Sequence, residues 1–132
     1  MAQAKSLTPA ELEHLLEFVS QRTYAMRNRL ILAFGFHAGM RVGEISSLTI
    51  ADVMNSDGRV KTEVRLSAEQ TKGRHPRTVF LPQRLQTELQ EYLDFRQPAN
   101  PVHPLFVTAG RRAFSANVMT QHLYWLYRAA GI

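Results

Sequence analysis

The sequence predicts a mainly α-helical domain with a small antiparallel β-sheet, an α+β arrangement, on the basis of three observations. Apolar residues follow helical spacing over most of the chain, with capping signals at the helix starts. Between residues 60 and 81 the apolar period changes to two, which is the period of strands. The length of 132 residues suits one domain with one core. We therefore expect a single domain covering residues 1–132.

The first two helices have clear ends. Thr8 can cap the first helix, Pro9 fits its first position, and Glu11 completes a capping box with Thr8. The second helix is expected from about Tyr24 to Ala38. Its part from Leu30 to Phe36 is apolar nearly all round, so this helix should lie at the centre of the domain. Gly39 is expected to terminate it in a left-handed conformation.

Three further helices are expected. A short one covers Val42 to Leu48, and another carries Leu85, Leu89 and Tyr92 on one face. Ser115 caps the last helix. The apolar face of that helix consists of Met119, Leu123, Leu126 and Ala130. Because nothing in the chain follows to cover this face, we expect homo-oligomerisation through it, by dimerisation or exchange of elements.

The strands follow a turn cluster at residues 55–58. Apolar and polar residues alternate from Val60 to Ser67, which predicts a strand with one buried face. Thr78 to Leu81 is a second strand, ended by Pro82. The stretch between them is polar and contains Gly73, as expected for a hairpin connection.

The positive charge is concentrated in two segments. The chain carries a net charge of +5. Residues 59–78 contain six cations and two anions, and residues 100–132 contain three arginines, Arg111 and Arg112 among them, and no acid. This distribution predicts a polyanionic partner, nucleic acid ahead of an acidic membrane surface. The charge alone fits a merely soluble basic surface equally well.

Several classes of protein are excluded or disfavoured by composition. The chain has no cysteine, which excludes disulfides and thiolate metal sites. No apolar stretch is long enough to span a membrane, and residues 1–5 include no apolar signal core. We therefore expect a cytoplasmic protein with no membrane association.

Two motifs stand out together: "GMRVGEISSL", with Arg41 and Glu44, and "TKGRHPRTVFLP", with Thr71, Lys72, Arg74 and Arg77. With the helix start "LTPAELEHLL", they resemble, in order and spacing, the catalytic domain of the tyrosine recombinases or phage-type integrases. One such motif would be weak evidence, but three in order are specific. The resemblance covers essentially the whole chain and implies a bacterial or phage-encoded enzyme that breaks and rejoins double-stranded DNA. It does so through a 3′-phosphotyrosine intermediate, with no cofactor and no metal.

The resemblance assigns roles to individual residues. Arg41 matches the first catalytic arginine, and Lys72 matches the hairpin lysine that acts as general acid. An arginine fork at a helix N-terminus suits a phosphate, because guanidinium, dipole and free N–H groups all favour an anion. Glu44 is expected to hold the Arg41 guanidinium, although an ordinary acid of a first helical turn would explain it equally well. We interpret Thr71, Arg74 and Arg77 as contacts to DNA phosphates.

The sequence also departs from the family pattern. The family requires a His-x-x-Arg box and a tyrosine nucleophile near the C-terminus, and none of the five histidines here begins such a box. Tyr24 and Tyr92 are poorly placed for a nucleophile, and we interpret Tyr124 and Tyr127 as core aromatics. The chain is therefore expected to be a truncated tyrosine-recombinase catalytic domain. It would lack the C-terminal box, the nucleophile and the N-terminal core-binding domain, and be inactive alone.

Two alternatives remain. Gly35, Gly39 and Ile45 have the spacing of a helix-turn-helix, which would make the chain a non-enzymatic DNA-binding module with Arg41 on the DNA backbone. The second alternative is a regulatory remnant that competes with a complete recombinase for DNA or protein contacts.

Overall fold

The computed structural model describes residues 6–132 and has the expected mainly helical α+β arrangement. In chain order the elements are α1 (Pro9–Ser20), α2 (Ala25–Phe36), α3 (Val42–Ser47), α4 (Ile50–Val53), β1 (Glu63–Leu66), the 3-10 turn η1 (Ala68–Gln70), β2 (Arg77–Phe80), α5 (Gln83–Arg96) and α6 (Ala116–Ala129). Residues 1–5, on which the expectation of no export signal rests, lie outside the described residues.

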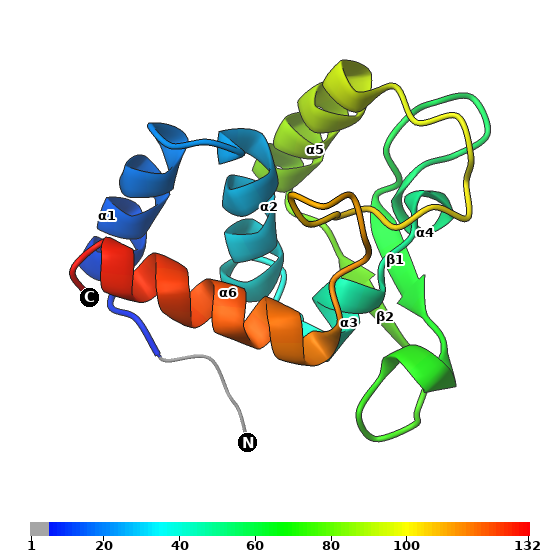
Figure 1. Cartoon of the computed structure of the whole chain (residues 1–132). Helices are drawn as coiled ribbons and strands as arrows, with labels where there is room; N and C mark the ends of the chain where they lie inside the picture. The colour runs from blue at the N-terminus through cyan, green and yellow to red at the C-terminus, as the bar shows by residue number, and fades with distance from the viewer. Residues whose placement is uncertain (1–5) are drawn as a thin grey trace.

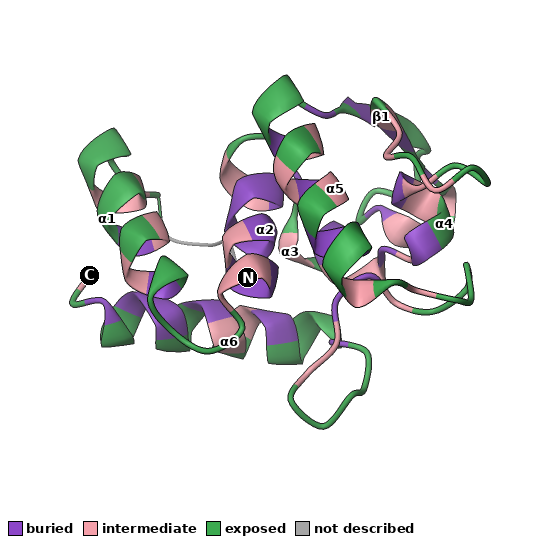
Figure 2. Cartoon of the chain, turned by 90° about the horizontal axis from the view of Figure 1, so that it is seen from above, coloured by how far each residue is buried: buried purple, intermediate pink, exposed green. Residues whose placement is uncertain are grey.

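The central helix is α2, which packs against α1 on one side and α5 on the other, while α6 crosses beside them toward α3 (Figure 1). Seen from above, the buried faces of these helices turn toward one another (Figure 2). Leu30, Ile31, Leu32 and Phe34 of α2 are almost completely buried. The all-round apolar pattern therefore marked the centre of the core, as predicted.

The helix caps that the sequence predicts are present. The Thr8 hydroxyl accepts a hydrogen bond from the Glu11 N–H at 3.1 Å, and the Glu11 carboxylate accepts one from the Thr8 N–H at 3.0 Å. Ser115 caps α6 by accepting from the Val118 N–H. Only the end of α2 differs from the prediction: Gly39 has the expected left-handed φ of 71°, but the helix already ends at Phe36, with His37 as its C-cap.

The two strands form an antiparallel hairpin in which Glu63 pairs with Phe80 and Leu66 with Arg77. The first strand is shorter than predicted. Val60 makes an isolated bridge with Met54 at the end of α4, and its N–H donates to the Gln90 side chain. The alternating pattern therefore continues through residues that pair outside the sheet, and the short helix α4 was missed.

The expectation of an uncovered face on the last helix is wrong. Met119 and Leu123 are at most 5% exposed, and Leu126 and Ala130 are also buried. They pack within the chain because α6 lies against α3 and α1, where His14 also contacts the carbonyl of Ala130. The reason for expecting oligomerisation through this stripe is therefore gone.

Candidate phosphate-binding site

The N-terminus of α3 is organised by a buried carboxylate. Glu44 is only 1% exposed, and its Oε1 accepts a hydrogen bond from the backbone N–H of Arg41 at 2.9 Å. This bond satisfies one of the amides that a helix start leaves without an intrahelical acceptor. Arg41 precedes the first residue of α3 in an extended conformation, and its side chain is exposed. The helix start thus holds the Arg41 backbone and leaves the guanidinium to solvent.

Arg77 supplies the cation that neutralises this carboxylate. Its Nε donates to Oε2 of Glu44 at 3.1 Å, and one terminal nitrogen donates to Oε1 at 2.7 Å and to the Gly39 carbonyl at 3.3 Å. We expected Glu44 to hold the Arg41 guanidinium. Its carboxylate instead contacts the Arg41 backbone and the Arg77 side chain. The fork of Arg77 therefore joins β2 to the turn between α2 and α3.

Burial alone would raise the pKa of the Glu44 carboxyl. The hydrogen bonds from Arg77 and from the Arg41 backbone, together with the positive charges of both residues, outweigh burial and hold this pKa below its ordinary value. The same pairing raises the pKa of the Arg77 guanidinium. Glu44 is consequently a charged group in a nearly solvent-free position, stable only because it is paired.

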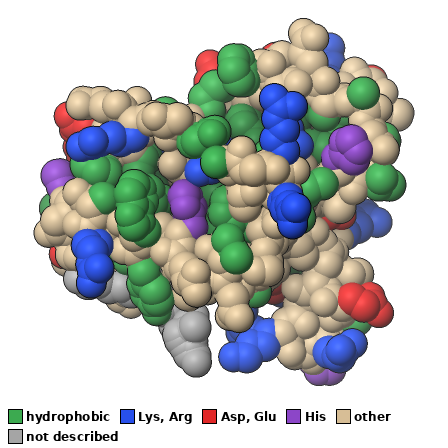
Figure 3. All heavy atoms as spheres, in the orientation of Figure 1, with side chains coloured by type: hydrophobic (Ala, Val, Ile, Leu, Met, Phe, Trp, Pro, Cys, Tyr) green, Lys and Arg blue, Asp and Glu red, His purple; other side chains and the backbone are tan. Residues whose placement is uncertain are grey.

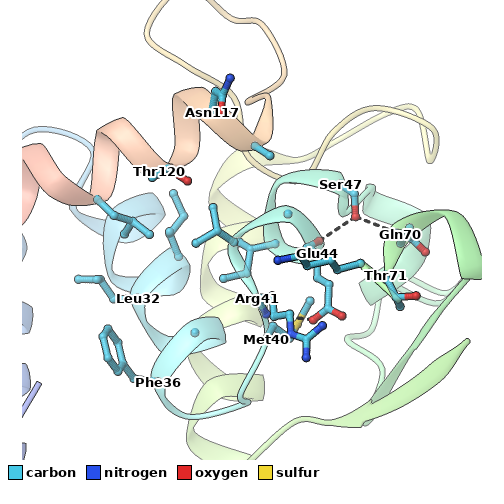
Figure 4. Close-up of a pocket in the computed structure, with 18 of the residues that line it drawn as sticks. Leu32, Phe36, Met40, Arg41, Glu44, Ser47, Gln70, Thr71, Asn117 and Thr120 are labelled. Atoms are coloured by element: carbon cyan, nitrogen blue, oxygen red, sulfur yellow. Dashed lines mark hydrogen bonds between the residues drawn. The ribbon is translucent and has the colours of Figure 1, made fainter. Parts of the chain in front are cut away.

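A pocket of about 580 Å³ opens beside this ion pair, between α2, α3, α6 and the hairpin (Figure 4). Four predicted site residues line it: Arg41, Glu44, Thr71 and Lys72. Figure 4 shows Arg41 and Thr71 on the hairpin side, with Thr120 of α6 and Leu32 of α2 across from them. The fold therefore brings both predicted catalytic residues, from distant parts of the chain, to one cavity.

The hairpin connection is anchored where it leaves η1. The Gln70 side chain donates to Ser47 Oγ and to the Asp52 carboxylate, and the buried Thr71 hydroxyl donates to the His75 carbonyl at 2.9 Å. Thr71 thus folds the connection inward, while Lys72 and Arg74 are exposed. Lys and Arg side chains project from the lower right of the molecule, where the hairpin lies (Figure 3). These cations are available to an external anion.

The floor of the pocket is apolar and contains one unusual group. Leu32, Phe36 and Leu123 contribute to the lining, together with Tyr127. Tyr127 is 4% exposed, and its hydroxyl is the one buried side-chain polar atom without a hydrogen-bond partner among the described residues. Burial, followed by the neighbouring Tyr124, raises the pKa of Tyr127 to about 12. Tyr127 is a core aromatic as expected, whereas Tyr124 is 46% exposed and is not.

A second polar cluster was missed at the sequence level. Arg27 of α2 is 8% exposed; its Nε donates to Asn28 Oδ1 and another guanidinium nitrogen donates to the Val107 carbonyl. His122 of α6 contacts the same Asn28 oxygen at 2.8 Å. The guanidinium lies over the rings of Tyr24 and Phe114, at 4.3 and 5.4 Å. None of these six residues lines the pocket beside Arg41.

Neither a metal site nor a membrane span was found in the described part of the chain. No group of three or more His, Cys, Asp or Glu side chains within residues 6–132 is arranged to hold a metal ion. In the same residues, no helix is both long and apolar enough to cross a bilayer.

Comparison with known proteins gives a consistent answer. The model of the phage integrase family matches residues 5–132. The chain is 34% identical over 108 residues to tyrosine recombinase XerA from Pyrococcus furiosus, a match covering 82% of this chain and 34% of XerA. It is 32% identical over 89 residues to tyrosine recombinase XerC from Pelobacter propionicus, covering 67% of this chain and 27% of XerC. The matches thus span about a third of each relative, or less.

Solved structures agree on the fold. A crystal structure of XerA recombinase superposes with a TM-score of 0.74 at 26% identity, covering 98% of this chain and 44% of that one. The Tn1549 transposon integrase, solved in complex with circular intermediate DNA, gives a TM-score of 0.59 at 20% identity. That match covers 96% of this chain and 45% of the integrase chain, and it bears on the fold alone.

Proposed function

The chain belongs to the phage integrase family of tyrosine recombinases, and from this premise we propose that it seats a DNA phosphate in the pocket beside α3. In this proposal Arg41 binds the scissile phosphate and Lys72 protonates the leaving 5′ oxygen. The observation that carries it is that both side chains line one pocket, next to a helix N-terminus. Membership of a recombinase family supports DNA as the partner.

The chemistry gives each residue a physical task. Transfer of a phosphoryl group without a metal needs protein cations to neutralise charge on the non-bridging oxygens. Arginine suits this task because its planar fork donates two hydrogen bonds to a phosphate and stays charged. Lysine on an exposed connection suits proton donation, because its flexible stem brings an ammonium to the leaving oxygen. Thr71 and Arg74 complete the seat from the hairpin, with Arg74 as a phosphate contact.

We further propose that the chain corresponds to the front portion of a recombinase catalytic domain and cannot cleave DNA by itself. Its sequence contains no His-x-x-Arg box, and of its four tyrosines Tyr92 and Tyr127 are buried, which leaves only Tyr24 and Tyr124 exposed. A suicide DNA substrate, which traps a covalent intermediate, should give no protein–DNA adduct. An adduct mapped to any tyrosine would overturn this part of the proposal. We infer that the complete protein is a bacterial or phage recombinase acting in the cytoplasm.

DNA binding by the chain tests the phosphate seat directly. Replacing Arg41 with Gln should weaken binding to duplex DNA and lower the slope of log affinity against log salt by about one. Arg84→Gln is the matched control, because Arg84 is an exposed arginine of α5 that does not line the pocket. Equal losses from both variants would mean that only net charge matters, and the proposed seat would be wrong.

The helix-turn-helix alternative has a distinct signature. It draws on the α2–α3 turn at Gly39, but α3 spans only Val42–Ser47, with Glu44 and Ile45 buried. Few side chains remain to read bases. If Arg41 merely positions a recognition helix, Arg41→Lys should keep most of the DNA affinity. A bidentate phosphate seat should lose it, because an ammonium cannot reproduce the fork.

A further inference from the structure

We propose that Arg77 is a positioning residue that acts through Glu44, and that it does not serve mainly as a phosphate contact. In this view the Glu44–Arg77 pair fixes the hairpin to the start of α3, so that Lys72 and Arg41 face the same phosphate. The inference rests on the proposed function of the pocket. It concerns how the pocket is assembled, and it changes the role assigned to Arg77 from the sequence.

The Arg77 guanidinium is directed toward the interior of the protein. Two of its guanidinium nitrogens point to both oxygens of Glu44, at 3.1 and 2.7 Å. The Glu44 side chain is 2% exposed and the Arg77 side chain 43%. Removing the partner of a carboxylate buried this deeply lowers the free energy of unfolding much more than breaking a surface ion pair does. Arg77 is therefore committed to an internal partner.

The Glu44–Arg77 pair joins β2 to the turn that precedes α3. Oε1 of Glu44 also accepts the Arg41 N–H, and the Arg77 nitrogen that binds Oε1 also donates to the Gly39 carbonyl. One guanidinium thus holds both ends of the short turn from Gly39 to Arg41. That turn contains Gly39, whose backbone is in the left-handed region. The side chain of Arg77 and the backbone of Arg41 are therefore linked through a single carboxylate.

Lys72 lies on the connection between η1 and β2. The hairpin connection is anchored at one end by the buried Thr71 and at the other by Arg77, the first residue of β2. Every residue from 72 to 76 is exposed. With little burial of its own, the segment takes its position from its two anchors. Release of the Arg77 anchor should therefore loosen Lys72 relative to Arg41.

The two roles for Arg77 predict opposite results for Glu44→Gln. If Arg77 is mainly a phosphate contact, this variant frees the guanidinium and removes a negative charge near the DNA, so affinity should rise. If Arg77 is a positioning residue, the seat becomes misaligned and affinity should fall, by about tenfold for a coupling of this kind. Arg77→Lys, which keeps the charge but loses the fork, should also weaken binding.

The experiment measures duplex DNA affinity across a salt series for Glu44→Gln, Arg77→Gln, Arg77→Lys and the double variant with Gln at both positions. The fraction of folded protein is checked by urea unfolding. We expect the double variant to bind no more weakly than the single ones, because both remove the same link. Additive losses, or tighter binding by Glu44→Gln, would overturn the inference.

Arg29→Gln and Glu88→Gln provide the matched control. This second ion pair has an Nε–Oε1 distance of 3.1 Å, is 25% exposed on each side, and does not line the pocket beside Arg41. Its variants should change stability without changing the affinity of the folded fraction for DNA. If they weaken DNA binding as much as Arg77→Gln does, the role of Arg77 is general stability and the inference fails.

Hydrogen exchange in the free protein tests the anchor without DNA. In Arg77→Lys, the amides of the 72–75 segment should exchange faster, while those of α5 stay unchanged. Unchanged exchange in the segment would refute the anchor even if Glu44→Gln does not fold. Failure of the proposed function is recognised separately, because Arg41→Gln would then leave DNA affinity at the level of the Arg84→Gln control.

Discussion

Arg27 and Arg77 both bond to buried polar groups, but only Arg77 does so through a carboxylate. Arg77 keeps 43% of its side chain exposed beside the pocket and binds Glu44. Arg27 is enclosed between two aromatic rings and donates to an amide oxygen and a backbone carbonyl. Arg77 therefore joins parts of the candidate site, whereas Arg27 joins parts of the core.

Each arrangement offsets the cost of burying charge differently. Glu44 and Arg77 neutralise each other, so each depends strongly on its partner. For Arg27, burial lowers the pKa of the guanidinium, and the nearby Tyr92 and Tyr24 offset this lowering in part. Because it connects α2 to the loop before α6, its removal should affect the whole fold. Removal of Arg77 should affect the hairpin and the α3 start most.

The largest effect is expected for Arg27→Ala. It leaves the Val107 carbonyl without its donor and opens a space between Tyr24 and Phe114, so the free energy of unfolding should fall by about 3 kcal/mol. Urea unfolding measures this. Arg22→Ala is the control, since Arg22 is exposed and lies over the Phe18 ring at 4.3 Å; it should cost less than about 1 kcal/mol.

A loss below 1 kcal/mol for Arg27→Ala would show that the cluster contributes little to the core. The affinity of the folded fraction for DNA is the second readout, and it should match that of the unmodified chain. Weaker DNA binding by Arg27→Ala would mean that Arg27 also contributes to the candidate site, so that the distinction from Arg77 fails.

The next largest effect is a pH dependence at His122, in the Arg27 cluster. Burial, and then the charge of Arg27, lower the pKa of His122 from 6.5 to about 4. The neutral ring is therefore favoured in the folded state, and the unfolded chain binds a proton first as pH falls. Stability from this group is complete above pH 6.5 and is lost progressively toward pH 4. After discounting for partial exposure, the loss is on the order of 2 kcal/mol.

Urea unfolding at a series of pH values checks this, with His122→Gln as the variant that should flatten the curve between pH 6.5 and 4. Glu44 provides the contrast, since its pKa is lowered from 4.5. Its contribution is present above pH 4.5 and is lost only as pH falls below that value. Glu44→Gln should therefore leave the slope between pH 6.5 and 5 unchanged. A changed slope between pH 6.5 and 5 would contradict the lowered pKa of Glu44.

The sequence predicted the structure well where it depends on residues close together in the chain, as in helices and their N-caps. Thr8 with Glu11, and Ser115, act at the helix starts predicted for them, whereas α2 ends at Phe36, before the predicted terminator Gly39. The strand starting at Val60 was predicted too long, because a period of two does not say which partner a residue pairs with. The prediction that the apolar face of α6 is uncovered was wrong for a related reason. This face is covered by helices that come earlier in the chain.

The sequence identified residues of the candidate site but not the contacts that they make. The motifs identified Arg41, Glu44, Lys72 and Arg77, but Arg77 binds Glu44 across 33 positions, and no local spacing encodes that pairing. Arg27 was missed altogether, because an arginine near the start of an apolar helix is ordinarily a surface residue. Its acceptor at Val107 lies 80 positions away. Only the tertiary fold reveals these partners.

The smallest effect, and one of opposite sign, is expected for Tyr127→Phe. Tyr127 is the limiting case of the comparison, because its buried hydroxyl has neither a carboxylate nor a neutral partner among the described residues. Removing it should therefore raise the free energy of unfolding, by up to about 1 kcal/mol. Tyr92→Phe is the control: the Tyr92 hydroxyl donates to the Leu105 carbonyl at 3.2 Å, so its loss should destabilise by about 1 kcal/mol. If both variants lose stability equally, the Tyr127 hydroxyl has an acceptor in solution, and the pocket floor beside Arg41 is more polar than its side chains indicate.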